Sequence, residues 1–406
     1  MSCVPKTRAR FLLSGGTVYK IANSTTPSSI GRRGRFCASE DEVQLPTYEE
    51  IARDERQLGV LETPFEESLF VVGPPGSGKT VLAVQRAQML ADAGNSAVLI
   101  TFNRMLRRLI AQLTEGQVQA RTMHSFVSRH YRRQTASPVP SRKGDDYDYI
   151  WDGMFSKLQE RGVTPGPVHT IVDEAQDLPR SFFRYLRDFV ANTVTVFADE
   201  DQALRADRST LRDIKAAGRF GDPILLTANH RNTPEIARVA EFFHAGDAPV
   251  PEVKRRPSGE LPRLVAYRMG SATELIANWY STRGGRVGVA VVRNPTGKDL
   301  YSRLRARLAG QRVQSYTNER KNENEIDLLA PGITILNVNS IKGQEFDTVF
   351  VMEIGVLLRR ASEVNNRKMY MLCARARDNL FLMHEGDHLL AALLERLPGA
   401  DILERP

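Results

Sequence analysis

A glycine-rich segment, residues 73–80, carries the residue types needed to bind a chain of phosphates. It reads Gly-Pro-Pro-Gly-Ser-Gly-Lys-Thr and fits the pattern G-x-x-x-x-G-K-[ST]. The glycines let backbone N–H groups surround phosphate oxygens, Lys79 reaches the outer phosphates, and the Thr80 hydroxyl is suited to Mg²⁺. An apolar run at 69–72 precedes the segment and a helical stretch follows it, which predicts strand, turn and helix. The predicted phosphate-binding residues are Gly73, Pro74, Pro75, Gly76, Ser77, Gly78, Lys79 and Thr80.

Two adjacent carboxylates follow another apolar run and supply the remaining chemistry of phosphoryl transfer. Residues 170–172 lead directly into the string Asp-Glu-Ala-Gln-Asp at 173–177. Here Asp173 would hold Mg²⁺ together with Thr80, and Glu174 would take a proton from the attacking water. An acidic N-cap of the next helix is the alternative interpretation. The presence of the glycine-rich segment favours hydrolysis of ATP, with Mg²⁺ as cofactor.

The string at 173–177 resembles the second motif of UvrD/Rep-type superfamily 1 DNA helicases, and other motifs of that family occur in the family's order. Gln57 lies where the family places the glutamine that reads adenine. A D-x-x-Q element ends at Gln202, the position that the family uses to sense the γ-phosphate. Segments 101–104 and 122–126 resemble the motifs that contact the nucleic-acid strand. The strand contacts implied in the first half are Thr101, Phe102, Asn103, Thr122 and His124.

Three segments of the second half, 229–232, 340–346 and 370–377, resemble the family motifs N-Y-R-S, S-x-K-G-x-E-F and Y-V-A-x-T-R-A. The resemblance implies a ring that stacks on adenine, two arginine fingers at the γ-phosphate and a carboxylate near the ribose. His230 would be the stacking ring, Arg231 and Arg375 the two arginine fingers, and Glu345 the carboxylate near the ribose. Asn339 and Ser340 join the implied strand contacts. Cations from a far lobe stabilise transition-state charge only when the cleft shuts, which would link hydrolysis to lobe movement.

The sequence departs from the family pattern in ways that affect the grip on the strand. Residues 203–207 replace the aromatic run that stacks on bases, and 337–339 read Asn-Val-Asn in place of T-x-H. Short segments, 127–167 and 295–332, stand where the family carries large accessory domains. The first contains a basic group that either contacts phosphates or forms a solvated helix face. Its members are Arg129, His130, Tyr131, Arg132, Arg133, Arg142 and Lys143.

Short apolar runs separated by helix-length segments predict an α/β fold with buried parallel strands. In the first half the runs are 69–72, 97–100, 170–172, 193–198 and 223–226. In the second half they are 287–292, 333–338, 348–352 and 380–383, followed by an amphipathic stretch at 388–397. We therefore expect two RecA-like P-loop NTPase domains with parallel sheets and the ATP site in the cleft between them. The predicted domains are an N-terminal arm at 1–46, a first domain at 47–222 with the short insert 127–167, and a second at 223–406.

Composition is typical of a globular protein with an anionic partner. The 406 residues are 41% hydrophobic, and 56 basic against 48 acidic residues give a net charge of +8. No apolar run approaches the roughly 18 residues of a membrane span. Three cysteines without C-x-x-C spacing indicate neither a zinc site nor a disulfide framework, which favours the cytoplasm. The first 39 residues hold seven Lys or Arg and no acid; we favour a basic arm or small hairpin over a transit peptide.

Three functional hypotheses follow. The leading one is a minimal ATP-dependent helicase or translocase on single-stranded DNA, moving 3′ to 5′ if the family's polarity carries over. The second is an ATPase motor or sensor subunit of a larger complex with a nuclease partner, in phage defence or repair, with little unwinding of its own. The third is an RNA helicase, which the motifs at 173–177, 340–346 and 370–377 favour less than a DNA enzyme.

Overall fold

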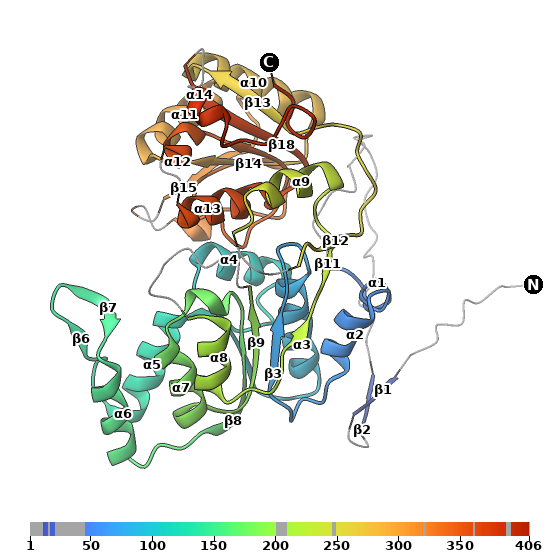
Figure 1. The fold of residues 1–406 in the computed structure, drawn as a ribbon. Coiled ribbons are helices and arrows are strands. Elements are labelled where there is room, and N and C mark those ends of the chain that lie inside the picture. Colours follow the sequence, from blue (N-terminus) through green and yellow to red (C-terminus); the bar gives the residue numbers. More distant parts are fainter. Residues whose placement is uncertain are drawn as a thin grey trace, which may run out of the picture.

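Two α/β lobes are stacked one on the other in the computed structural model, the first coloured blue to green and the second yellow to red (Figure 1). The structure describes residues 45–199, 209–245, 249–317, 319, 322–359, 362–386 and 391–405, together with strand residues 11–14 and 17–20. Each lobe contains a six-stranded sheet whose neighbouring strands are all parallel. The predicted fold of two RecA-like domains is confirmed.

The sheet of the first lobe has the strand order β10-β3-β9-β8-β4-β5. Its strands are β3 (Leu69–Val72), β4 (Ala97–Thr101), β5 (Ala120–Thr122), β8 (Gly166–Val172), β9 (Ala191–Ala198) and β10 (Ile224–Leu225). Its helices are α1 (Tyr48–Ile51), α2 (Glu55–Glu62), α3 (Lys79–Asp92), α4 (Arg104–Leu113), α5 (Met123–Thr135), α6 (Trp151–Glu160), η1 (Ala175–Asp177), α7 (Arg180–Phe189) and α8 (Leu211–Gly218). Helical crossovers between parallel strands bring the carboxyl ends of β3, β4, β5 and β8 to one edge of the sheet.

The sheet of the second lobe has the order β13-β18-β17-β14-β16-β15. Its strands are β13 (Arg263–Tyr267), β14 (Arg286–Val291), β15 (Val313–Tyr316), β16 (Gly332–Asn337), β17 (Phe346–Val351) and β18 (Ala376–Glu385). Its helices are α9 (Pro234–Phe242), α10 (Met269–Arg283), α11 (Asn294–Arg307), η2 (Glu323–Glu325), α12 (Ile354–Leu358), α13 (Glu363–Cys373) and α14 (Ala391–Leu394). A short parallel pair, β11 (Ala228–Asn229) with β12 (Glu252–Val253), lies where the chain enters this lobe.

The boundary predicted after residue 222 lies too early. Segment 223–226, expected to open the second domain, contributes β10 to the first sheet, where Ile224 pairs with Val71 and Leu225 with Val72. Because this parallel pairing fixes β10 to β3, the crossover into the second lobe follows β10. The amphipathic stretch expected at 388–397 includes α14, and its residues 388–390 lie outside the described residues.

Two antiparallel hairpins lie outside the main sheets. β1 (Phe11–Ser14) pairs with β2 (Thr17–Lys20) in the N-terminal segment, where the sequence predicts a basic arm or small hairpin. β6 (Ser141–Arg142) pairs with β7 (Asp145–Tyr149) and projects from the first lobe beside α5 and α6 (Figure 1). The predicted insert 127–167 thus consists of most of α5, this hairpin, α6 and the start of β8.

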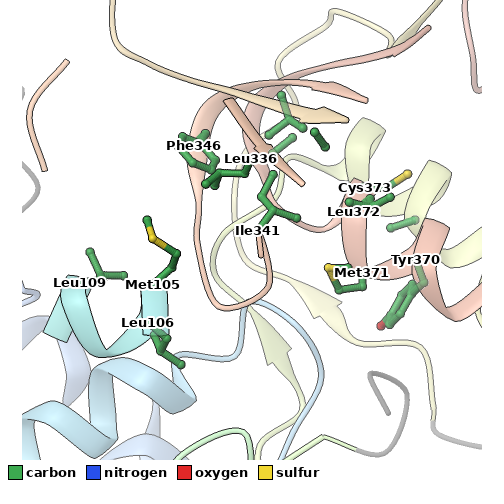
Figure 2. Close-up of a cluster of buried hydrophobic side chains, with 14 of the residues drawn as sticks. Met105, Leu106, Leu109, Leu336, Ile341, Phe346, Tyr370, Met371, Leu372 and Cys373 are labelled. Atoms are coloured by element: carbon green, nitrogen blue, oxygen red, sulfur yellow. The ribbon is translucent and has the colours of Figure 1, made fainter. Parts of the chain in front are cut away.

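An apolar contact joins the lobes beside the sheet edges. Met105, Leu106 and Leu109 of α4 belong to the same buried cluster as Ile341 and Phe346 of the second lobe. Figure 2 shows Ile341 on a loop that descends from the second lobe towards α4. The approach is close at Gly343, where an added Cβ would lie 3.0 Å from a methyl group of Leu106. The lobes therefore share a core at the place where motif residues of both sides meet.

Arg86 on α3 connects the helix that begins at Lys79 to the segment that follows α2. Its guanidinium is fully buried and donates to the carbonyl oxygens of Val60 (3.1 Å), Thr63 (2.8 Å) and Pro64 (2.9 Å). Burial lowers the pKa of Arg86 to about 10, which leaves it charged. Arg86 thereby holds two elements of the candidate site together.

We predict that Arg86→Met lowers the free energy of unfolding of the first lobe by about 2–4 kcal/mol, because three buried carbonyls lose their donor. Thermal and urea unfolding would measure the loss. Arg161→Met on the exposed surface is the matched control and should be neutral. Equal stability of the two variants would contradict the role given to Arg86.

Candidate functional site: a nucleotide cleft between the lobes

A cleft of about 1000 Å³ separates the lobes at the carboxyl edge of the first sheet. Its floor is the glycine-rich loop with the start of α3, and α2 forms one wall. Segments 227–231, 343–345 and 375–377 line it from the side of the second lobe. The cleft lining includes twelve predicted nucleotide-site residues: Gln57, Pro75, Gly76, Ser77, Gly78, Lys79, Thr80, Glu174, His230, Arg231, Glu345 and Arg375.

The glycine-rich loop has the backbone that its sequence predicts. Gly76 and Gly78 are left-handed, with φ of 80° and 84°. A Cβ at Gly76 would collide with the side-chain oxygen of Asn229, and one at Gly78 would lie 2.8 Å from Nε2 of Gln57. Glycine is therefore required at both positions for its conformation and for the close approach of neighbouring side chains.

Lys79 begins α3 and turns its ammonium group back over the loop. Its Nζ donates to the carbonyl oxygens of Gly73 (2.5 Å) and Pro74 (2.8 Å) and lies 3.3 Å from Oδ2 of Asp199. The helix N-terminus adds a positive dipole at the same place. The loop thus concentrates positive potential and backbone donors where a phosphate chain would lie.

Thr80 and Asp173 form a pair of oxygen donors suited to Mg²⁺. The Thr80 hydroxyl donates to Oδ2 of Asp173 at 2.7 Å. Burial, and then the charge of Glu174, raises the pKa of Asp173 to about 7. A buried carboxylate beside another negative charge favours a cation, and hydroxyl and carboxylate oxygens are ligands that Mg²⁺ prefers. The pair fits the ion, which when bound would neutralise phosphate charge.

Glu174 is held in a strained backbone conformation at the end of β8. Its φ is 55°, and its N–H donates to Oδ1 of Asp173 at 2.9 Å. Gln176 fixes the carboxylate, because its Nε2 donates to Oε2 of Glu174 at 2.6 Å while its Oε1 accepts the N–H of Asp199. Strain of this kind persists where surrounding bonds determine the conformation. The candidate base is thus fixed in place before any substrate arrives.

Lys342 reaches the same carboxylates from the second lobe. Its Nζ lies 2.8 Å from Oδ2 of Asp177 and 3.4 Å from Oε2 of Glu174, and its side chain is 4% exposed. Burial opposes its charge, but Asp177 and Glu174 outweigh burial and raise the pKa of Lys342. Burial also opposes ionisation of Glu174, and the charges of Lys342, Arg375 and Lys79 together lower its pKa. Both groups are therefore charged at neutral pH.

The two predicted arginine fingers lie on the far wall with different partners. Arg231 donates through Nε to Oε2 of Glu345 at 2.7 Å. Arg375 is 2% exposed and donates to the carbonyl oxygen of Met371 at 3.0 Å. Burial, and then the charge of Arg231, lowers the pKa of Arg375 to about 10. Both guanidiniums belong to residues that line the cleft.

The predicted adenine contacts lie at the α2 side of the cleft. Gln57 is buried, and its Nε2 donates to the carbonyl oxygen of Ser77 at 2.9 Å. The His230 ring is exposed, and its Nε2 lies 3.0 Å from Oδ2 of Asp54, the N-cap of α2. Asp54 thereby links the ring to the helix that carries Gln57.

The residues predicted to contact a nucleic-acid strand differ in how far they are exposed to solvent. Thr101 and Ser340 are buried in this structure, and their roles as strand contacts stay predictions. Thr122 is the N-cap of α5. Asn103 is partly buried and donates to the carbonyl oxygen of Lys342 at 2.8 Å, whereas Asn339 is exposed.

His124 and Phe102 belong to a ring cluster at the start of α5. Their ring centroids are 6.2 Å apart, and the His124 ring also packs edge-on against Tyr147 at 4.7 Å and Tyr149 at 5.3 Å. The side chain of Tyr147 on the hairpin is 57% exposed. The predicted contact residues therefore lie beside the β6–β7 hairpin.

The basic group of the insert divides into two parts. Tyr131 is buried, and the His130 ring lies 2.6 Å from the Tyr185 hydroxyl. Burial, and then the charge of Arg133, lowers the pKa of His130 to about 4, so the ring is neutral and is no phosphate-binding cation. Three of its exposed members, Arg129, Arg132 and Arg133, line an open groove of about 420 Å³ on α5.

Sequence reasoning missed several residues that position the site. Gln176, Asp177 and Lys342 lie inside quoted motifs, yet the resemblance assigns them no role. Only their residue types could have indicated a role, because a lysine in a glycine-containing loop of one lobe can form an ion pair with acids of the other lobe. Asp54 carries no motif signal. Gln202, predicted to sense the γ-phosphate, lies outside the described residues.

Comparison with known proteins gives a family match to part of the first lobe and a remote likeness to solved structures. Residues 58–207, in the first lobe, match a family model described as an AAA domain. No curated protein matches the chain. Among solved structures, the chain is similar to the C-terminal domain of a possible DNA helicase from Lactobacillus plantarum WCFS1, with 22% identity over 44% of this chain and 99% of that chain and a TM-score of 0.31. It is also similar to the Arterivirus nonstructural protein 10 helicase, with 14% identity over 84% of this chain and 65% of that chain and a TM-score of 0.37.

The cleft geometry and the AAA-domain match support a nucleotide-hydrolysing protein built from two RecA-like domains. In the part of the chain that the structure describes, no helix is long and apolar enough to cross a membrane.

We predict that Lys79→Ala and Glu174→Gln each abolish most ATP turnover but differ in ATP binding. Lys79 faces the phosphate site, so its loss should weaken affinity strongly, whereas Glu174 acts on water and its amide variant should still bind. Steady-state turnover and binding of a fluorescent ATP analogue would separate the two effects. Near-normal turnover by Glu174→Gln would remove it as the general base.

We predict that Arg231→Ala and Arg375→Ala each reduce turnover by on the order of 10³-fold, with a smaller effect on ATP affinity. Each removes a cation that the second lobe brings to the transition state. Arg303→Ala on the exposed face of α11 is the control and should be silent. A variant that keeps wild-type kcat would exclude its arginine from the mechanism.

Proposed function

We propose that the protein is a minimal UvrD/Rep-type motor that hydrolyses ATP to translocate on single-stranded DNA in the 3′ to 5′ direction. The observation that carries this proposal is the composition of the cleft. Lys79, Thr80, Asp173 and Glu174 stand on one lobe, and the other lobe contributes a pair of arginines. Such a site is complete only when both lobes contribute, so each turnover would be tied to a change in their separation.

The placement of the predicted strand contacts supports a strand path across both lobes. Asn103 follows β4 and His124 follows β5, at the carboxyl edge of the first sheet. Asn103 donates to carbonyl oxygens of the second-lobe loop that also carries exposed Asn339. A strand that touches both sides of this junction would be moved when the lobes open and close. The arginine groove on α5 would add salt-sensitive phosphate contacts.

The small size of the inserts supports translocation over extensive unwinding. The first insert holds most of α5, a two-stranded hairpin and α6, and in the described part of 295–332 only α11, β15 and the short η2 helix occur before β16. Neither is large enough to grip a duplex ahead of the strand path. We therefore propose that the protein moves along a strand but has few elements that could separate the strands of a duplex fork.

A second candidate function is that of a motor subunit in a larger complex, such as one with a nuclease. The observation that favours it is the exposed apolar surface of the hairpin region, where Tyr147 is 57% and Ile150 44% exposed. Affinity capture of the full chain from its native cell would test it. An RNA substrate remains the third candidate, separable by the assay below.

We predict that single-stranded DNA stimulates ATP hydrolysis more than single-stranded RNA or blunt duplex does. The purified protein should displace a protein block from a single strand but open only duplexes of about one or two helical turns. Turnover with each nucleic acid, and stopped-flow unwinding against duplex length, are the measurements, with Lys79→Ala as the inactive control. Efficient single-turnover opening of much longer duplexes by the monomer would contradict this proposal.

A further inference from the structure

The ring of His230 and the carboxylate of Asp54 form a contact in the lining of the nucleotide cleft. Both residues line the cleft, and Nε2 of His230 lies 3.0 Å from Oδ2 of Asp54. Their side chains are 36% and 16% exposed. Asp54 lies at the start of α2, whereas His230 follows β11. The contact therefore joins an element of the first lobe to the segment through which the chain enters the second.

Asp54 divides its two oxygens between the helix and the ring. Oδ1 accepts the backbone N–H groups of Arg56 (3.0 Å) and Gln57 (3.2 Å), which makes Asp54 the N-cap of α2. Oδ2 faces the ring of His230. One carboxylate thus holds the backbone of Gln57 and the ring of His230, the two residues that the family resemblance assigns to adenine.

The charge of Asp54 fixes the role of the ring nitrogen. Burial raises the pKa of Asp54, but the hydrogen bonds from His230, Gln57 and Arg56 outweigh burial and lower it. Asp54 is therefore a carboxylate at neutral pH, and a carboxylate can only accept hydrogen bonds. Nε2 of His230 must then carry a proton and donate the bond. Because an imidazole N–H lies in the plane of the ring, this contact uses the ring edge and leaves the ring faces for stacking.

A ring at this place binds a base more tightly when it is already held. The backbone N–H of His230 donates to the carbonyl oxygen of Gly76 at 2.9 Å, which fixes the main chain but leaves the side chain free to rotate. A partly exposed side chain loses this freedom when a ligand orders it, and the loss weakens binding. The contact with Asp54 orders the ring before a nucleotide arrives, so binding loses less side-chain entropy.

We propose that Asp54 is a positioning residue that holds the His230 ring by its edge for stacking on the base of a nucleotide, and thereby sets the part of nucleotide affinity that comes from the base. This inference rests on the proposed function for the identity of the occupant, ATP. It assigns a part in base recognition to a side chain that acts through His230.

The test compares the binding of a nonhydrolysable ATP analogue with that of inorganic triphosphate, which has no base, by isothermal titration calorimetry with Mg²⁺. The variant is Asp54→Ser, because serine caps a helix as well as aspartate does but is too short to reach the ring. We expect the analogue to bind about three- to tenfold more weakly, whereas the affinity for inorganic triphosphate stays at the wild-type value. Asp54→Thr, a second short capping residue, should behave in the same way.

His230→Phe separates an effect through the ring from an effect through α2. Phenylalanine can stack on a base but has no group that Asp54 could hold. In a double-mutant cycle, Asp54→Ser should weaken binding of the analogue when residue 230 is histidine and change nothing in the His230→Phe background. Asp222→Ser, which removes an exposed carboxylate paired with Lys215, is the matched control and should bind both ligands as the wild type does.

The outcomes distinguish this inference from the proposed function. A wild-type protein that binds the analogue but neither hydrolyses ATP nor moves on a strand would overturn the proposed function, while the binding cycle would still decide the role of Asp54. Wild-type affinity for the analogue in Asp54→Ser, or an equal loss in both backgrounds, would overturn that role. An equal loss of affinity for inorganic triphosphate would also overturn it, because the effect would then not involve the base.

Discussion

A buried cluster of opposite charges between the lobes is the constraint on which the site depends. Its acids all come from the first lobe: Asp173, Glu174, Asp177 and Asp199. Its cations are Lys79 of the first lobe and Lys342 and Arg375 of the second. Buried charges are tolerated only when paired, and removing one partner leaves an uncompensated ion. The first lobe has one of these cations for its four acids, so most of the compensating positive charge at its catalytic edge comes from the second lobe.

Packing around the cluster fits this electrostatic dependence. The α4 contact with Ile341 and Phe346 excludes water beside the charges, which strengthens their interaction. The same contact brings the loop carbonyls of Ser340 and Lys342 to Asn103. An apolar contact alone would allow the lobes to slide, whereas the bonds to Asn103 fix its register. The interface therefore combines a non-directional apolar contact with a few directional hydrogen bonds, which favour one arrangement of the lobes over others.

Sequence reasoning predicted the parts of this structure whose chemistry is local. Interior strands of both sheets are buried on both faces and appear in the sequence as apolar runs. The edge strands β5, β13 and β15 are only partly buried, and the sequence shows no apolar run for them. Edge strand β10 was found among the apolar runs of the first half, but the predicted domain boundary placed it in the second domain, because an apolar run does not reveal its pairing partner. The glycine-rich loop and the pair Asp173 and Glu174 were predicted for the same reason of local spacing.

The contacts that escaped prediction join residues far apart in the chain. Lys342 meets Glu174, and His230 meets Asp54, only because the fold brings separate elements together.

The contacts of the cations that line the cleft also affect how the site would accommodate a triphosphate. Lys79 is bonded to loop carbonyls and Arg231 to Glu345, so each cation must exchange a protein acceptor for a phosphate oxygen. Exchange of one acceptor for another changes the free energy less than pairing a bare cation would. A site built this way can close on a nucleotide and reopen after hydrolysis, as a cycling motor requires.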